Sequence, residues 1–425
     1  MNRYRSERPR LQQAMSVLCA FALSICYATI ATAQWKSVSL TSKIEHVQPW
    51  TGIVLWSDNP KNQSDAIQLE YSYMRYDDVA HREGSFDWSP VELLLDDVAS
   101  RGHQAILRFY FVYPGKPTTV PPFIKSRSDY QETEGKSEGK LTAFPDWTNA
   151  ALREFTLDFY TAFAKRFDRD PRLAYLQTGF GLWAEYHIYS GPREMGRTFP
   201  SKEFQRTFAH HLDQVFQQTP WMISVDAADN SYSPFEDDPE LLSLRFGLFD
   251  DSFLCKPHPK ENALNWRFFG ANRWKQSPGG GEFSYYNRND QRNALSEDGP
   301  NRQSFEDASQ QFHITFMIGN DQPRYQSMDR IKSAGLATGY RFRIQRLEVS
   351  GSRARIEVTN EGVAPPYFDS YLVVDGKRAE DSLRGLLPGE SRRIEVPFSG
   401  DRPSMSITSD RLVPGQKIEF AADLR

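Results

Sequence analysis

Residues Asp170–Ser190, DPRLAYLQTGFGLWAEYHIYS, predict a buried strand that runs into a glycine-rich turn carrying a carboxylate. The apolar run at 173–178 has the length of a strand, and Gly179 and Gly181 allow bends that would strain a residue with a Cβ atom. Glu185 follows the turn. Its sequence neighbours are aromatic or titratable: Trp183, Tyr186, His187 and Tyr189. A carboxylate at the end of a strand, with aromatic neighbours, is typical of a site that holds or cleaves a sugar.

The chain around this stretch alternates short apolar strands with amphipathic helices. Strand candidates also lie at 52–56, 67–79, 104–114, 221–225, 243–253, 273–285 and 311–319, and helix candidates at 86–103, 146–167 and 201–218. Such alternation favours a parallel α/β sheet, and about eight strands within roughly 300 residues favour a closed (β/α)8 TIM barrel over an open sheet. The candidate at 273–285 has little apolar character and is the weakest of the set. The connection at 114–146 is long and lacks a period, as functional or mobile segments usually do.

The pattern changes near Ala337, where apolar and polar residues alternate with period two between turn signals and no helix is indicated. Several short strands at regular spacing predict a small antiparallel β-sandwich. We therefore divide the chain into a signal peptide at 1–33, a barrel at 34–336 and a β-sandwich at 337–425. We expect the sandwich to buttress the barrel; the alternative is a sugar-binding module.

Residues 1–33 have the three parts of a secretory signal peptide. Four arginines precede an apolar run that ends at Ala31-Thr32-Ala33, which predicts cleavage after Ala33 and a secreted or periplasmic protein. The alternative is an uncleaved N-terminal anchor. No later stretch approaches the roughly 20 apolar residues that a membrane-spanning helix needs. Removal of the signal leaves Cys255 as the only cysteine, which excludes an internal disulfide and a cysteine-based zinc site.

The charge balance argues against nucleic acid as a partner. The formal net charge is −4, and because residues 1–33 hold four arginines and one glutamate, the remainder carries 47 basic and 54 acidic side chains. Phosphate binding requires a concentrated basic surface. The sequence also lacks a P-loop, a Rossmann glycine pattern, an HExxH motif and a GxSxG elbow, so no cofactor and no metal are expected.

The catalytic candidates follow from the barrel, because active sites of this fold lie at the C-terminal ends of the strands. Glu185 occupies such a position, and glycoside hydrolysis requires a second carboxylate from another strand end. Glu282 has the most suggestive setting, since three glycines precede it and aromatic residues follow it. The other candidates are Asp226, Asp229, Asp250 and Asp251. The alternative for Glu185 is an ordinary salt-bridging residue, and for Glu282 it is a solvated acid after a flexible loop. For Asp250 and Asp251 the alternative is a loop cap or a partner of an arginine.

Four stretches resemble a known group of proteins: WTGIVLW at 50–56, EGSFDWSPVELLLDDVASRGHQAILRF at 83–109, DPRLAYLQTGFGLWAEYH at 170–187 and GYRFRIQRLEV at 339–349. The group comprises secreted bacterial (β/α)8 proteins allied to the retaining glycoside hydrolases whose acid/base and nucleophile lie on strands four and seven. Within it the chain is most similar to an uncharacterised family whose barrel ends in a β-sandwich domain of unknown function.

The resemblance implies that Glu185 is the acid/base and Glu282 the nucleophile, and it matches Arg108 more loosely, at the end of the third strand. Ala184 departs from the pattern, because the clan usually has at this position an asparagine that binds the sugar 2-hydroxyl. We therefore predict a retaining glycoside hydrolase acting on an oligo- or polysaccharide. The alternatives are a non-catalytic carbohydrate-binding barrel and a structural protein of the cell envelope.

Around the two glutamates we expect a set of substrate-binding side chains: Trp56, Arg108, Trp183, His187, Asp250 and Tyr286. Each has a structural alternative. Arg108 can form an ion pair with a barrel acid, and His187 can serve only local hydrogen bonding. Asp250 can cap a loop or pair with an arginine, and aromatic side chains are more often part of a core than of a sugar platform.

Overall fold

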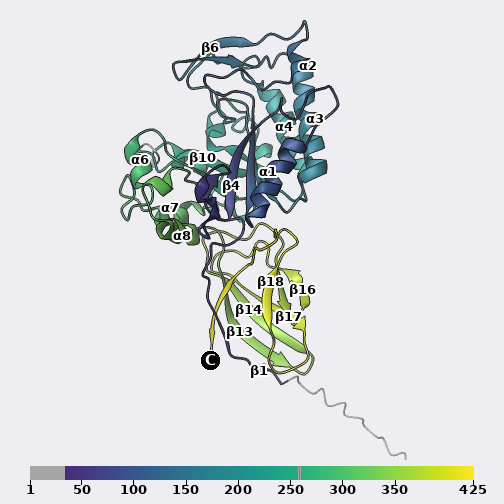
Figure 1. Ribbon diagram of the computed structural model, residues 1–425, viewed down its shortest axis with the longest axis vertical. Helices are drawn as coiled ribbons and strands as arrows, with labels where there is room; N and C mark the ends of the chain where they lie inside the picture. The colour runs from purple at the N-terminus through teal and green to yellow at the C-terminus, as the bar shows by residue number, and fades with distance from the viewer. Residues whose placement is uncertain (1–33, 257, 259) are drawn as a thin grey trace, which may run out of the picture. The chain divides into compact units, whose positions relative to one another are not determined.

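The computed structural model describes residues 34–256, 258 and 260–425 (Figure 1). The predicted signal peptide lies outside these residues. Residues 35–425 form one compact unit. Across the described part of the chain, no helix is both long enough and apolar enough to cross a membrane.

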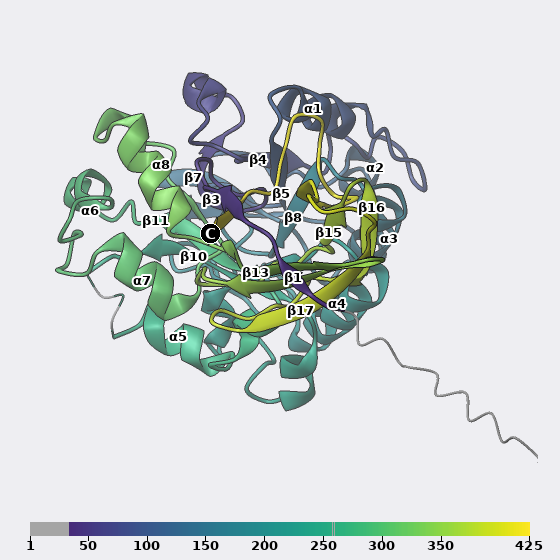
Figure 2. The same ribbon diagram turned by 90° about the horizontal axis from the view of Figure 1, so that it is seen from below.

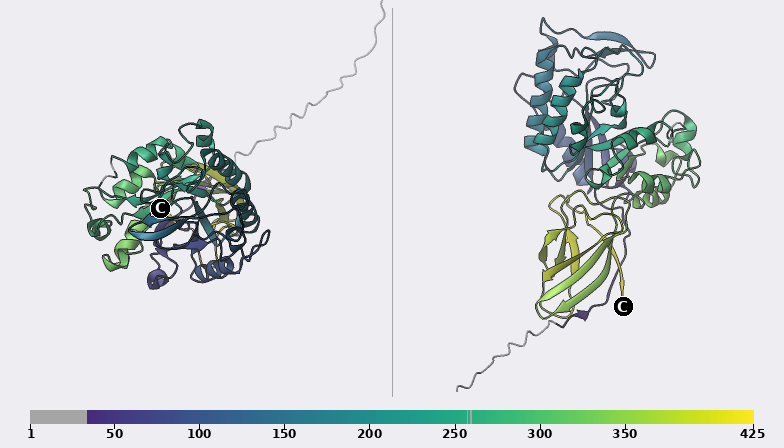
Figure 3. Two further views of the ribbon diagram at one scale, coloured as in Figure 1. Left: turned by 90° about the horizontal axis from the view of Figure 1, so that it is seen from above. Right: turned by 180° about the vertical axis from the view of Figure 1, so that it is seen from behind.

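Eight parallel strands form a closed barrel in which each strand pairs with the next one along the barrel. In the view from above, helices surround these strands (Figure 3). Every predicted strand position contains one of them, including the weakest candidate. The strands are β3 (Gly52–Trp56), β4 (Leu69–Arg75), β5 (Gln104–Tyr110), β8 (Leu173–Thr178), β9 (Trp221–Ser224), β10 (Gly247–Phe253), β11 (Gly279–Phe283) and β12 (Phe316–Ile318). The prediction of an α/β fold built on a (β/α)8 barrel is confirmed.

The helices follow the amphipathic stretches of the sequence. The longest of them begins after Asn149, whose side chain accepts a hydrogen bond from the Leu152 amide and so caps the first turn. Its buried side chains at 155, 159, 163 and 167 are all phenylalanines that contact one another along one face. The helices are α1 (Ser89–Ser100), α2 (Pro122–Lys125), α3 (Ala150–Phe167), α4 (Lys202–Val215), α5 (Asn262–Phe268), α6 (Arg288–Asn293), α7 (Phe305–Phe312) and α8 (Met328–Leu336).

Two connections of the barrel depart from regular strand–helix alternation. After β3 the described chain forms only a short 3-10 segment, Pro60–Gln63, and after β9 only two, Val225–Ala228 and Pro239–Ser243. Further 3-10 turns lie at Arg273–Lys275 and Gln322–Arg324. The long aperiodic connection between β5 and β8 contains a hairpin, β6 (Thr133–Ser137) with β7 (Lys140–Phe144).

Seven strands follow the barrel: β13 (Phe342–Ser350), β14 (Arg353–Asn360), β15 (Tyr371–Val374), β16 (Lys377–Ser382), β17 (Ser391–Pro397), β18 (Met405–Thr408) and β19 (Phe420–Leu424). They belong to a three-stranded antiparallel sheet, β16-β15-β18, and to a six-stranded sheet. The antiparallel expectation has one exception, because β19 runs parallel to β13. Apolar side chains from both sheets belong to one buried cluster.

The six-stranded sheet also contains two strands from the other end of the described chain. β1 (Lys36–Ser37) pairs with β13, and β2 (Leu40–Ser42) pairs with β19 (Figure 2). The division predicted from the sequence places these residues in the barrel segment, because strands of two and three residues show no hydrophobic period. The division of the chain at 336/337 stays a prediction.

The buried cluster of the sheets continues into the barrel interior. Tyr175 of β8 stacks on Phe316 of β12, with ring centroids 5.2 Å apart, and also contacts Phe368. The buried Arg411 donates hydrogen bonds to the carbonyl oxygens of Asp168 and Leu173, at the N-terminal end of β8. These contacts cover the N-terminal end of the barrel and leave the C-terminal ends of the strands for a site.

Candidate active site

A cleft of about 1240 Å³ opens at the C-terminal ends of the barrel strands. Its lining combines carboxylates with aromatic side chains. A second cavity, of about 350 Å³, lies beside α5 and α7 and has no aspartate or glutamate in its lining. The chemistry therefore belongs to the larger cleft, whose lining residues are Trp56, Tyr73, Tyr113, Glu138, Trp183, Glu185, His187, Tyr189, Asp226, Asp229, Tyr232, Asp250, Asp251, Ser252, Asn265, Glu282, Tyr285 and Tyr286.

The turn after β8 is a compact loop that places Glu185 in this cleft. A Cβ atom on Gly179 would lie 2.1 Å from the Ala184 carbonyl oxygen, and one on Gly181 would lie 2.0 Å from the His187 carbonyl oxygen. Trp183 and Ala184 both adopt the left-handed conformation, with φ of 54° and 58°, which is unfavourable for residues with a side chain. The glycines are thus required by close backbone approach. Ala184 is fully buried, so its side chain does not take part in the cleft lining.

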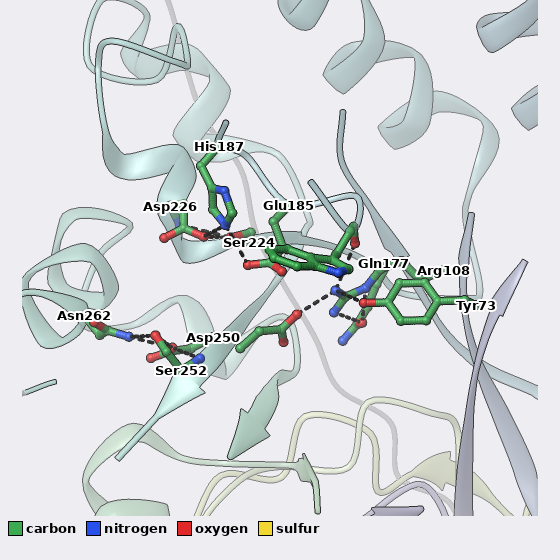
Figure 4. Close-up of polar contacts among 12 residues, drawn as sticks. Tyr73, Arg108, Gln177, Glu185, His187, Ser224, Asp226, Asp250, Ser252 and Asn262 are labelled. Atoms are coloured by element: carbon green, nitrogen blue, oxygen red, sulfur yellow. Dashed lines mark hydrogen bonds and ion pairs between the residues drawn. The ribbon is translucent and has the colours of Figure 1, made fainter. Parts of the chain in front are cut away.

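Glu185 lies against His187 inside the cleft (Figure 4). The Oε2 atom of Glu185 is 3.1 Å from Nε2 of His187, and Oδ2 of Asp226 is 3.8 Å from the same nitrogen. Burial and the nearby Asp251 raise the pKa of Glu185 from 4.5 to about 7, although His187 partly opposes them. Burial opposes protonation of His187, but Glu185 overcomes this effect and raises the pKa of His187 to about 9. Glu185 can therefore hold or release a proton near neutral pH.

Asp226 follows β9 and completes a group with Glu185 and His187. Ser224 donates a hydrogen bond to its carboxylate, and burial raises its pKa above the usual value. One ligand atom from each of the three residues lies within 4.8 Å of the others, so this group could hold a metal ion. In the structure His187 fills the space between the two carboxylates. The expectation that the protein has no metal site stays a prediction.

Glu282 lies on β11, directly after three glycines that pack tightly. A Cβ atom on Gly281 would lie 2.0 Å from the Asp250 carbonyl oxygen, and one on Gly280 would lie 2.5 Å from the Phe316 ring. Burial and the nearby Asp251 raise the pKa of Glu282 well above 4.5, and Arg108 offsets only part of this effect. Among the described residues, no side chain donates a hydrogen bond to Glu282. Glu282 and Glu185 line the same cleft.

Arg108 does not line the cleft but lies beneath it, fully buried in the barrel. Its Nη1 atom is 2.6 Å from Oδ2 of Asp251, and its Nε and Nη2 atoms donate to the Gln177 side-chain oxygen (Figure 4). The guanidinium also stacks over the Phe249 ring at 4.1 Å. Arg108 contacts the cleft lining through Asp251 and, at 3.4 Å, through the Tyr73 hydroxyl.

The sequence favours Asp250 as the substrate-binding aspartate, but Asp251 is the one that pairs with Arg108. It follows Asp250 on β10, and neighbouring residues of a strand point to opposite faces, so one aspartate points toward Arg108 and the other toward α5. Oδ1 of Asp251 is buried without a hydrogen-bond partner among the described residues. The available signal was the Asp-Asp pair at the end of a predicted strand. The sequence could not reveal which of the two pairs with the buried arginine.

Asp250 is held from the side of α5. Its Oδ1 accepts a hydrogen bond from Asn262 at 2.7 Å, its Oδ2 accepts one from the Trp266 indole at 3.0 Å, and His258 lies 3.4 Å from Oδ2. Burial disfavours its ionisation, but the His258 and Trp266 contacts hold its pKa below the usual value. Asp250 lines the edge of the cleft, but both oxygens of its carboxylate already accept hydrogen bonds. Its predicted role in binding substrate stays a prediction.

Aromatic side chains form the walls of the cleft. Trp183 and Tyr189 stack with ring centroids 6.3 Å apart, and Tyr286 is 69% exposed at the rim. Trp56 lies at the end of β3, and its ring meets Tyr73 edge-on at 6.2 Å. Four of the predicted substrate-binding residues therefore line this one cleft: Trp56, Trp183, His187 and Tyr286.

Comparisons with known proteins bear on the fold alone. No family model matches the sequence, and no curated protein matches it. The matching solved structures include an α-galactosidase from Thermus thermophilus in complex with p-nitrophenyl α-D-galactopyranoside (14% identity, 75% of this chain and 66% of that chain, TM-score 0.40). They also include the catalytic domain of β-amylase from Paenibacillus polymyxa (10% identity, 68% and 99%, TM-score 0.41) and a GH36 α-galactosidase from Geobacillus stearothermophilus (11% identity, 84% and 55%, TM-score 0.37). The chain thus spans just under two thirds of the Thermus enzyme and about half of the Geobacillus enzyme, and these matches are glycoside hydrolases.

Proposed function

We propose that the protein is a secreted glycoside hydrolase that acts on an oligo- or polysaccharide with retention of configuration. The observation that supports this proposal most is the pair formed by the buried Glu185 and the half-buried Glu282, two glutamates from different strand ends that line one cleft. Glu185 contributes to the raised pKa of Glu282, and aromatic walls suited to sugar rings flank both. Retaining enzymes need such a pair.

Glu185 is the proposed acid/base. With a pKa of about 7 it carries a proton over much of the neutral range and can give it to the leaving-group oxygen. The second carboxylate attacks the anomeric carbon as the glycosidic bond breaks, which forms a glycosyl-enzyme ester. Glu185, now ionised, takes a proton from water, and the water oxygen attacks the anomeric carbon and releases the carboxylate.

Glu282 is the proposed nucleophile, and Asp251 is the competing candidate. In the free cleft the raised pKa of Glu282 favours its protonated form, and the positive charge that develops on the sugar favours ionisation. Asp251 is paired with Arg108 and has a free oxygen, so its carboxylate is also available. A slow 2-fluoro glycoside of the preferred sugar, followed by peptide mass mapping, distinguishes the two. Label on Glu282 supports the assignment, and label on Asp251 replaces it.

The second candidate function is a barrel that binds glycans without cleaving them. The observation that favours it is the buried Ala184, which leaves the sugar 2-hydroxyl without the asparagine that the related clan uses. A screen of the purified protein against a panel of polysaccharides comes first, with both binding and release of reducing ends measured. Binding without turnover in both wild type and Glu185→Ala supports the binder and contradicts the enzyme.

Once a substrate is known, leaving-group dependence tests the acid. Glu185→Ala should lose about 10²- to 10⁴-fold in kcat/KM on a natural glycan, because the leaving oxygen then departs without a proton. It should lose far less on a dinitrophenyl glycoside, whose leaving group needs no proton. Glu282→Gln should lose activity on both substrates. Equal losses on both substrates in Glu185→Ala would remove Glu185 from the role of acid.

A further inference from the structure

The cleft carries an unusual balance of charge. Its lining contains seven carboxylates and, within the described chain, neither a lysine nor an arginine. The seven come from five different parts of the barrel rim: Glu138, Glu185, Asp226, Asp229, Asp250, Asp251 and Glu282. A ligand that enters this cleft meets carboxyl groups from all five of these parts.

Two positive groups inside and beneath the cleft are already engaged. Arg108 lies below the floor and is paired with Asp251 at 2.6 Å. His187 lies between Glu185 and Asp226, at 3.1 and 3.8 Å. Neither group is available to a carboxylate or sulfate on a ligand, so the interior of the cleft disfavours uronic acids and sulfated sugars. Lys116 and Arg193 pack on the Tyr113 and Tyr232 rings, at 3.9 and 4.6 Å from the ring centroids, and are not themselves part of the lining.

The carboxylates are spread along the cleft and do not surround one point. Glu138 is exposed on the turn of the β6–β7 hairpin, Asp229 is exposed after β9, and Glu282 lies on β11. A single metal ion would engage only the group around His187. Distributed negative charge complements a ligand that repeats a positive charge along its length.

Two further features favour an organic cation. Asp251, a side chain only 8% exposed, lines the cleft, and its Oδ1 atom has no hydrogen-bond partner among the described residues. The cleft walls include Trp183, Tyr189 and Tyr286, and aromatic faces attract ammonium groups. A protonated amine on a sugar can satisfy both features, with its N–H groups directed to carboxylate oxygens and its positive charge near a ring.

We propose that the cleft binds glycans whose sugars carry free, protonated amino groups. This inference rests on the proposed function for the choice of a sugar as ligand, but it does not require turnover. It names the substrate class that the charges of the cleft select, namely amino-sugar oligosaccharides that lack their N-acyl groups.

The ionisation of the cleft agrees with this inference. Burial and mutual repulsion raise the pKa values of Glu185, Glu282 and Asp226, so the free cleft retains protons that isolated carboxylates would release. A bound ammonium group lowers these pKa values. Binding of the amino sugar should therefore release protons, which calorimetry in buffers of different ionisation enthalpy can measure.

The test compares three ligands of equal length by titration calorimetry at about pH 6: a glucosamine trisaccharide, its fully N-acetylated counterpart and a uronic acid trisaccharide. We expect the glucosamine trisaccharide to bind at least tenfold more tightly than the other two at low salt. The difference should shrink at about 0.5 M salt, where charges are screened within a few ångströms. Tighter binding of the N-acetylated or uronic acid ligand overturns the inference.

Substitutions at the rim connect the selectivity to the cleft. In the double variant Glu138→Gln/Asp229→Asn, the ratio of affinities for the glucosamine and N-acetylated trisaccharides should fall about threefold or more, since each exposed charge contributes modestly. Glu380→Gln/Asp381→Asn removes the same two charges from exposed positions on β16 and is the matched control; the ratio should stay at the wild-type value. An equal fall in both proteins would mean that net charge alone attracts the amine, and the inference would fail.

The outcomes separate this inference from the proposed function. Tight binding of the glucosamine trisaccharide without cleavage of any glycan refutes the hydrolase and retains the inference. Cleavage of neutral glycans with no preference for amines retains the hydrolase and refutes the inference. Amine binding that persists in EDTA supports it, and binding that requires an added divalent cation overturns it in favour of a metal at Glu185, His187 and Asp226.

Discussion

Replacement of Glu185 by glutamine should stabilise the protein at alkaline pH. Glu185 is 9% exposed, and its pKa in the folded protein is about 7, against an ordinary value of 4.5. Because the folded-state pKa is the higher one, folding favours the protonated form. The stability that this group contributes is fully present below about pH 4.5 and is lost as the pH rises through about 7.

The size of the effect follows from the same two values. At 1.36 kcal/mol for each pH unit, ionisation of Glu185 costs about 3 kcal/mol of folding free energy at pH 8 and under about 1 kcal/mol at pH 5. Glutamine keeps the shape of the side chain and cannot ionise. Guanidinium denaturation of Glu185→Gln and wild type at both pH values measures the difference. We expect the variant to gain up to about 3 kcal/mol at pH 8 relative to its difference at pH 5.

Glu419 provides a control of opposite sign. Burial opposes its ionisation, but hydrogen bonds from the His46 ring and from the amides of Glu45 and His46 hold its pKa below 4.5. Its contribution is present above the unfolded pKa and is lost as the pH falls, so Glu419→Gln should destabilise the protein at pH 8. A Glu185→Gln variant that is no more stable than wild type at pH 8 would refute the reasoning about the cleft.

Three other substitutions test the surroundings of the site. Arg108→Met should cost about 3–5 kcal/mol of unfolding free energy, because it leaves the Asp251 carboxylate buried and unpaired. The double variant Arg108→Met/Asp251→Asn should cost less than the sum of the two single variants. Additive costs in denaturation experiments would contradict the ion pair. Asp251 raises the pKa of Glu185, so Asp251→Asn should move the alkaline limb of the kcat/KM profile to lower pH. His187 lowers the pKa of Glu185, so His187→Asn should move this limb to higher pH. Shifts of both variants in the same direction would exclude Glu185 as the acid. Gly181→Ala should cost about 1–3 kcal/mol of unfolding free energy and most of the activity, because its Cβ would lie 2.0 Å from a carbonyl oxygen. Gly351→Ala is the control, because a Cβ atom at this position meets no atom within 4 Å. Equal melting temperatures of the two variants would count against the close approach at Gly181.

Much of the barrel could be predicted from the sequence because apolar runs of strand length are bounded there by turn residues. β11 was the hardest strand to predict, since Gly279–Gly281 bury backbone and not side chains. The glycines exist because Phe316 and the Asp250 carbonyl occupy the space where Cβ atoms would lie. A strand made of such residues has no hydrophobic period for a sequence reading to detect.

The carboxylates of the site could be predicted from the sequence, but the residues that pair with them could not. Glu185 and Glu282 stand out because each follows a predicted strand and has glycines nearby. Arg108, in contrast, reaches Asp251 from 143 residues away along the chain, and only the closed barrel brings β5 and β10 within reach of each other. Local patterns specify strands and turns, whereas the charge state of a buried carboxylate depends on partners that come from distant strands.

The pairing of β1 and β2 with β13 and β19 makes the barrel, in the order of the chain, an insertion between strands of one sheet. Residues 337–425 expressed alone would therefore lack two strands of their six-stranded sheet and would present β13 and β19 with unpaired backbone groups. Such edges invite association with other chains. The sheet can be completed only after the entire barrel has been synthesised, because the barrel lies between the paired strands in the order of the chain.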